Sequence, residues 1–187
     1  MIKPFLRILL LLFVAQAELC GSDLNSIYFV QNKSSSLKPI LDNKAQIKLP
    51  ESFELMSSDK IALKYPMVER RPSEVYSNKS GSINIAFNHT RSEASIEELP
   101  QIRDVLGMQI KKSTIDFIGS KIQAINGQDF AIFQFVSPAA NANIYNLMFV
   151  TVLENRLLIG TFNCTTNLRE EWEPIGKQIV SSMVITP

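Results

Sequence analysis

The chain has 187 residues, of which 45% are hydrophobic and 20% are charged. These values are typical of one globular domain and exclude a disordered chain, which has fewer apolar residues and a larger net charge. Lysine and arginine together number 19 against 18 aspartates and glutamates. Because general nucleic-acid-binding proteins carry a basic excess, we expect no nucleic-acid partner.

The N-terminus has the pattern of a secretory signal. Lys3 and Arg7 precede an apolar run over Ile8–Ala15, and Ala15–Ala17 fits the small-x-small rule for signal-peptidase cleavage. The run is short for a transmembrane helix, which takes roughly 20 apolar residues. We expect residues 1–17 to be a cleaved signal peptide, with an uncleaved anchor as the alternative. The mature chain is then exported, to the periplasm or the extracellular space, without a membrane span.

The chain has two cysteines, Cys20 and Cys164. Glu18 and Leu19, which precede Cys20, fit a bacterial lipoprotein signal poorly. In an oxidising compartment two thiols within reach tend to pair. A bridge that closes a loop of more than about a hundred residues would contribute roughly 4 kcal/mol. The alternative is two unpaired thiols, with Cys164 in an apolar strand, and the residues leave both possibilities open.

The chain after the signal divides into a tether and one domain. Residues 18–43 alternate short apolar pieces with serine, asparagine and lysine, which predicts a tether, and residues 44–187 predict a single domain. Ala45–Leu49 and Lys60–Tyr65 predict short strands, because each is followed by a proline that cannot continue a ladder. Ser82–Asn88 alternates apolar and polar residues, which predicts a strand with one buried face.

The middle of the chain predicts a helix over Ser95–Lys112. Ser95 and Glu98 have the spacing of a capping box. Pro100 would clash with a preceding helical turn, so the regular helix should begin near Pro100 itself.

Four strands should follow between Thr114 and Thr165. Asn126-Gly127 and Glu154-Asn155 are turn dipeptides that separate strands of hairpins. The second strand is apolar on both sides, so both faces of the sheet should be covered.

A last helix should cover one face of this sheet. Asn167 is the expected N-cap, and acids in the first turns favour a helix N-terminus. Trp172 and Ile179 belong to its expected buried side.

The segment YNLMFVTVLENRLLIGTFNCTTNLREEWEPIGKQIVSSMVI resembles the end of PsbP-like domains, a superfamily that includes the Ran-binding Mog proteins. In that group a strand such as Phe162–Cys164 leads into a helix with an aromatic and a proline, here Trp172 and Pro174. DKIALKYP and VYSNKSGSINIAFNHT resemble its early strands, so the likeness covers Ala45–Ile185. It implies an α+β fold, an α/β/α sandwich with a central, mainly antiparallel β-sheet. Its members mainly bind or scaffold, and bacterial DcrB-like exported proteins fit this chain best.

Residues for catalysis are scarce. His89 is the only histidine, and a pair with Cys164 or a hydrolase triad would depend on it. The sequence has no G-x-S-x-G motif, no phosphate-binding glycine motif and no cluster of metal ligands. We therefore expect no catalytic, metal-binding or cofactor-binding residues and no cofactor. Four aromatic side chains could line a groove for a peptide or lipid, although core packing explains them more simply: Phe53, Tyr65, Tyr76 and Phe87.

These observations favour an exported, non-enzymatic binding or scaffold protein of the cell envelope. Its partner would be another envelope or secreted protein, and the residues of its binding surface and its oligomeric state stay open. A carrier of a small apolar ligand, held between sheet and helix, is the alternative. A hydrolase that uses His89 ranks third.

Overall fold

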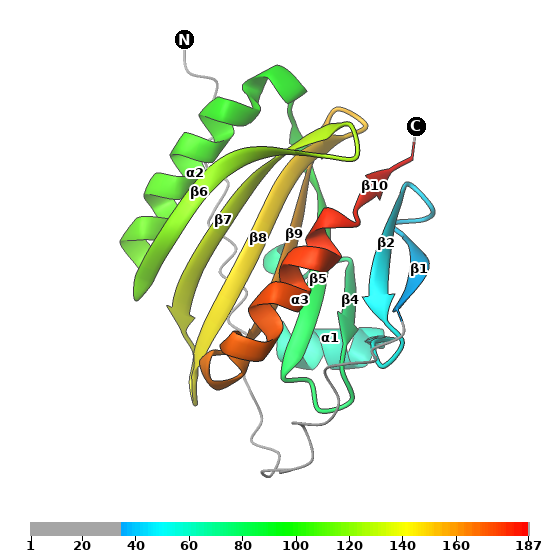
Figure 1. The fold of residues 1–187 in the computed structure, drawn as a ribbon, viewed down its shortest axis with the longest axis vertical. Coiled ribbons are helices and arrows are strands. Elements are labelled where there is room, and N and C mark those ends of the chain that lie inside the picture. Colours follow the sequence, from blue (N-terminus) through cyan, green and yellow to red (C-terminus); the bar gives the residue numbers. More distant parts are fainter. Residues whose placement is uncertain (1–34, 187) are drawn as a thin grey trace.

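The computed structural model describes residues 35–186, so the expected signal peptide, Cys20 and residues 18–34 of the expected tether lie outside the described residues. The core of the domain is a seven-stranded sheet in the order β3-β4-β5-β9-β8-β7-β6, in which every neighbouring pair is antiparallel (Figure 1). Its strands are β3 (Glu54–Leu55), β4 (Glu74–Ser77), β5 (Ile83–Glu93), β6 (Asp116–Ile125), β7 (Gln128–Pro138), β8 (Asn143–Leu153) and β9 (Arg156–Thr165).

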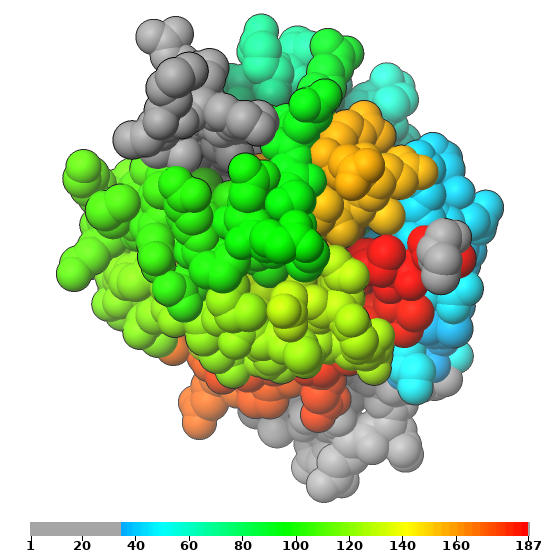
Figure 2. Space-filling view, turned by 90° about the horizontal axis from the view of Figure 1, so that it is seen from above, coloured from blue at the N-terminus to red at the C-terminus, as the bar shows by residue number. Residues whose placement is uncertain are grey.

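Helices cover both faces of this sheet. Alternate residues of β7 divide between two hydrophobic clusters: Ile132 packs in the cluster of Trp172, and Phe133 in that of Leu106. Figure 2 shows the corresponding helices, α2 (Leu99–Ser113) and α3 (Arg169–Ser181), on opposite sides of the sheet. The expected α/β/α sandwich is therefore confirmed. No helix within residues 35–186 is both long and apolar enough to cross a membrane. A third helix is α1 (Ser58–Lys64), and there are short 3₁₀ turns at η4 (Val68–Arg70), η5 (Ile96–Glu98) and η6 (Thr166–Leu168).

The four-stranded run from β6 to β9 is confirmed together with both of its turns. Asn126 and Gly127 have φ angles of 49° and 86°, and Glu154 and Asn155 have 50° and 57°. Positive φ at both central residues is the geometry of the tight turns that match the twist of a hairpin.

The start of α2 is as expected, and that of α3 is not. Ser95 and Glu98 form the capping box on η5, and α2 continues from Leu99 with a proline in its first turn. Asn167, the expected cap of the last helix, lies instead within η6, and α3 begins at Arg169. The 3₁₀ turn satisfies backbone groups before the helix, so a side-chain cap is not needed there.

Residues 35–43 were expected to be tether, and they belong to the domain. β1 (Ser35–Ile40) pairs with β2 (Ala45–Pro50), and β10 (Val184–Ile185) pairs with the other side of β2. A carboxylate oxygen of Glu74 accepts a hydrogen bond of 2.8 Å from the Leu41 backbone N–H, which ties the β1–β2 turn to the main sheet. β1 has a polar sequence because it is an edge strand that buries only Ile40.

Two other expectations were wrong. Lys60–Tyr65 is not a strand, because Lys60–Lys64 lies in α1 and Ile61 packs with Tyr65, the residue that ends the helix. Ser82–Asn88 does form the core of β5, but both of its faces are buried. Ile85 lies in the main core, whereas Ala86 packs with α1. A seven-residue helix was sufficient to cover the face that was expected to meet solvent.

Candidate functional site

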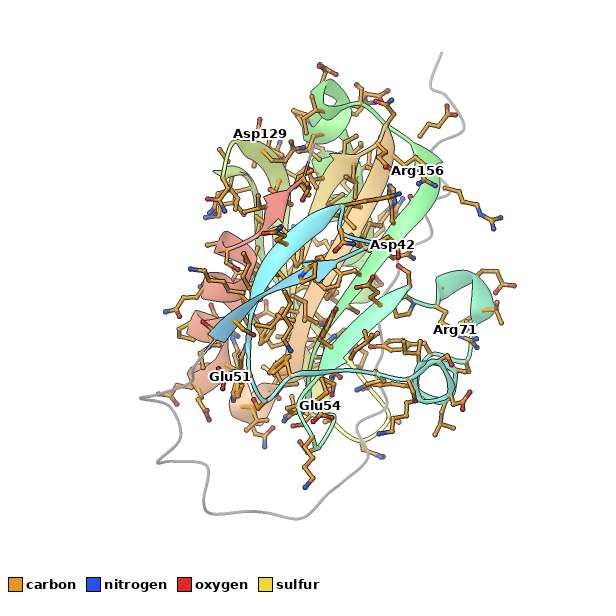
Figure 3. All side chains as sticks on the ribbon, turned by 90° about the vertical axis from the view of Figure 1, so that its right-hand side faces the viewer. Asp42, Glu51, Glu54, Arg71, Asp129 and Arg156 are labelled. Atoms are coloured by element: carbon orange, nitrogen blue, oxygen red, sulfur yellow. The ribbon has the colours of Figure 1, made fainter. Side chains whose placement is uncertain are left out.

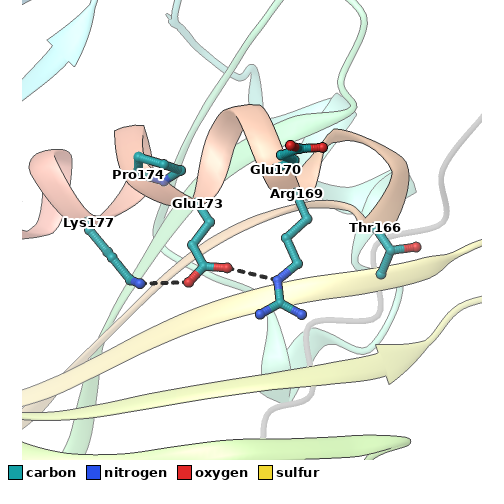
Figure 4. A pocket seen from close by; sticks show the side chains of 6 residues that line it. All are labelled: Thr166, Arg169, Glu170, Glu173, Pro174 and Lys177. Carbon is teal, nitrogen blue, oxygen red and sulfur yellow. Dashed lines mark hydrogen bonds and ion pairs between the residues drawn. The ribbon is translucent and has the colours of Figure 1, made fainter.

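A hollow of about 480 Å³ lies along the outer surface of α3 (Figure 4). Its side chains come from η6 and α3 and recur three or four positions apart, so they project from one side of the helix. The opposite side of α3 holds Trp172 and Ile179 in the core. The lining residues are Thr166, Arg169, Glu170, Glu173, Pro174 and Lys177.

Glu173 is the centre of this hollow. One of its oxygens accepts a hydrogen bond of 2.8 Å from Arg169 Nε, and the other accepts one of 2.6 Å from Lys177 Nζ (Figure 4). Partial burial raises the pKa of Glu173, but the hydrogen bonds from Lys177 and Arg169 hold it below its ordinary value. The carboxylate is therefore charged at neutral pH, and it fixes two cations on the surface of the helix.

Arg169 connects the hollow to the sheet. Its guanidinium carbon lies 4.8 Å from the centre of the Tyr145 ring on β8. The Tyr145 hydroxyl donates a hydrogen bond of 2.9 Å to Gln134 Oε1 on β7, and burial raises the pKa of Tyr145. A cation over an aromatic face is held by the ring quadrupole. Arg169 is thus positioned from two sides, by Glu173 and by Tyr145, before anything binds.

The hollow is suited to recognition of polar and charged groups. Glu170 and Lys177 are exposed and of opposite sign, and Thr166 adds a hydroxyl. Groups of this kind at the rim of an interface set specificity and association rate.

Among residues 35–186, no three His, Cys, Asp or Glu side chains gather in a geometry that could hold a metal ion.

His89 supports a turn at another edge of the molecule. Its Nε2 lies 2.9 Å from the Leu153 carbonyl, and its Nδ1 lies 3.2 Å from Arg156 Nη2. Since the guanidinium can only donate, Nδ1 accepts and Nε2 carries the proton. Glu154 Oε2 accepts a hydrogen bond of 2.8 Å from Lys44 Nζ and forms an ion pair with Arg156 Nη2 at 3.5 Å. Figure 3 shows Arg156 and Asp42 at the same end of the molecule, where the β1–β2 turn meets the sheet.

The structure separates His89 from Cys164. On the β5–β9 pair, His89 faces Leu158, whereas Cys164 faces Ile83, six positions further along β9. At about 3.3 Å per strand residue this separation is roughly 20 Å. A Cys164–His89 pair is therefore excluded. The groove of Phe53, Tyr65, Tyr76 and Phe87 is also wrong, because all four are buried and they divide between two clusters of the core.

We expect the Cys164 thiol to be unreactive in the folded protein. It is buried in the main core, and burial raises its pKa to about 12. The thiolate is the reactive form, so both access and ionisation oppose the reaction. In a Cys20→Ser variant at pH 8, a thiol-specific reagent should label Cys164 only after denaturant is added. Rapid labelling without denaturant would show that the core opens.

Sequence reasoning did not identify the hollow. The spacing of Arg169, Glu173 and Lys177 at i, i+4 could have indicated an ion-paired helix face. The contact between Arg169 and Tyr145 has no such local signal, since it depends on how α3 crosses β8.

No family model and no curated protein matches the chain, whereas several solved structures do. The chain is similar to cyanobacterial PsbP (CyanoP) from Synechocystis sp. PCC 6803, with 11% identity, a TM-score of 0.58, and 87% of this chain and 99% of that chain covered. It is also similar to LpqN, involved in cell envelope biogenesis of Mycobacterium tuberculosis, with 10% identity, a TM-score of 0.45, and 82% and 91% covered. PA94 from Pseudomonas aeruginosa has 13% identity, a TM-score of 0.45, and 82% and 98% covered. The likeness to CyanoP, with its TM-score of 0.58, confirms the expected PsbP-like fold.

Proposed function

We propose that this PsbP-fold chain is an exported, non-enzymatic binding or scaffold protein of the cell envelope, and that its α3 hollow contacts another envelope or secreted protein. The observation that carries the proposal is the fixed position of Arg169 between Glu173 and Tyr145. A side chain that is already ordered loses less entropy when it binds. The signal pattern of residues 1–17 supports export.

The alternatives have less support from the geometry. A carrier of a small apolar ligand needs space between the sheet and α3. At Gly176 that space is filled, because the Phe162 ring lies against the helix backbone. A hydrolase that uses His89 lacks the Cys164 partner, and His89 instead bonds to Leu153 and Arg156.

Site-specific photo-crosslinking tests the proposed surface. A photoreactive amino acid would replace Glu170 or Lys177, which are exposed in the hollow, and Lys111 or Lys112, which are exposed at the end of α2, as controls. In cells that export the protein, the α3 positions should give a defined adduct and the α2 positions should not. Equal adducts at both helices, or none at α3, would contradict the proposal.

A substitution extends this test to the chemistry of the hollow. Arg169→Met removes the cation and replaces the aliphatic part of the arginine with an unbranched apolar side chain. We expect the α3 adduct to fall several-fold, with an unchanged circular dichroism spectrum.

The intact mass of the exported protein should correspond to a mature chain that begins at Glu18. An additional mass released only on denaturation would favour the carrier instead.

A further inference from the structure

β6 pairs with β7 on one side, and on its outer side it pairs with no strand of residues 35–186. At the opposite end of the sheet β3 has only two residues, and in the small sheet β10 has two. β1 has six residues, but Pro39 interrupts its donors. Within residues 35–186, β6 is thus the long edge without a proline, and Figure 1 shows it at the margin of the sheet. Unpaired edges of this kind are templates for another strand.

The first part of β6 is protected and the second part is regular. The register with β7 shifts between Phe117 and Gly119, a β-bulge that disturbs pairing on the outer side as well. From Gly119 to Ile125 every residue has one partner on β7. This segment of seven residues carries a single charge, that of Lys121. Within Gly119–Ile125 there is therefore no proline and no bulge, and Lys121 carries the one charge that would oppose pairing with another strand.

We propose that two copies of this chain pair through Gly119–Ile125 as antiparallel strands, related by a two-fold axis at Ile122. In this register all seven residues find a partner, and the two seven-stranded sheets become continuous. Opposite residues of the two copies are Gly119 with Ile125, Ser120 with Ala124, Lys121 with Gln123, and Ile122 with itself.

The faces of the strand allow this register, and the charge of Lys121 favours it over an axis one residue away. Residues that oppose one another in an antiparallel pair lie on the same face of the sheet. Lys121 and Gln123 are paired with Ile132 and Phe130, whose cluster lies under α3, whereas Ile122 packs in the cluster under α2. A two-fold axis at Lys121 would place two lysines opposite each other, which is unfavourable. An axis at Ile122 places each lysine opposite a neutral amide.

Substitutions at Gln123 test the register by charge. Gln123→Glu would place a carboxylate opposite Lys121 of the other copy, twice in each dimer, and Gln123→Lys would place a second cation there. From the strength of cross-strand charge pairs we expect the glutamate to tighten dimerisation by about fivefold and the lysine to weaken it by a similar factor. Sedimentation equilibrium over a concentration series measures both. Equal dissociation constants, or the reverse order, would overturn the proposal.

Disulfide formation tests the two-fold axis directly. In the Cys20→Ser background, Ile122→Cys should form a covalent dimer on mild oxidation, because opposite Cα atoms are about 4.5–5.5 Å apart. Lys121→Cys alone should not, but it should crosslink with Gln123→Cys when the two proteins are mixed. Rapid crosslinking of Lys121→Cys with itself would refute the register. A chain that stays monomeric at every concentration would refute the dimer and leave the edge to an extended segment of another protein.

Discussion

Gly160→Ala should be strongly destabilising, by about 3 kcal/mol. Gly160 lies opposite Phe149 on the β8–β9 pair, and the phenyl ring covers the glycine so closely that an added Cβ would overlap it. Phe149 cannot move away, because it is fully buried and contacts the rings of Phe87 and Phe130. In a strand position without such a contact, alanine would stabilise the protein relative to glycine. Urea denaturation followed by circular dichroism would measure the loss.

A double-mutant cycle tests the cause of this effect. Phe149→Ala alone should cost about 3–5 kcal/mol, because it leaves a cavity in the core. With the ring removed, the Cβ of Gly160→Ala has space, so its additional cost should nearly vanish. Two costs that simply add would show that the ring does not cause the loss.

Glycine-to-alanine substitutions at the buried glycines of α2 and α3 should change the stability with opposite signs. In α3, a Cβ at Gly176 would lie 2.5 Å from Phe162 Cδ1, so Gly176→Ala should cost about 1–3 kcal/mol in spite of its better helix propensity. In α2, a Cβ at Gly107 would meet its nearest atom, Ser120 Oγ, at 3.7 Å, an ordinary contact. Gly107→Ala should therefore stabilise the protein by about 0.5–1 kcal/mol.

The two helical glycines are controls for each other, since the helix propensity gained is the same at both positions. The difference between their unfolding free energies reports how closely α3 approaches the sheet. If both alanines stabilised the chain, α3 would lie further from β9 than the structure places it.

The long strands and helices could be predicted from local patterns in the sequence. The turns at Asn126-Gly127 and Glu154-Asn155 need positive φ, and the dipeptides themselves indicate it. The capping box of Ser95 and Glu98 predicted the start of α2 within a few residues. These signals depend on residues that are neighbours in the chain, so the sequence contains them in full.

Short and exposed elements could not be predicted in this way. The residues of α1 read equally well as a strand, because one buried position per turn is too little to reveal a period. β1 buries one residue and so lacks an apolar pattern. Both elements exist because the folded sheet provides a surface or a partner strand for them. That surface is formed by residues distant in the sequence.

The sequence by itself determined the strands from β6 to β9, the helices that cover them and the resemblance to PsbP-like domains. The signal peptide and the partner stay predictions, and whether Cys20 and Cys164 pair stays open. Only the tertiary structure placed Arg169 over Tyr145, separated His89 from Cys164 and put Gly119–Ile125 at an open edge. Turn geometry and hydrophobic periodicity act over a few residues. Contacts such as Lys44 with Glu154 join residues far apart in the chain, so they depend on how the whole domain packs.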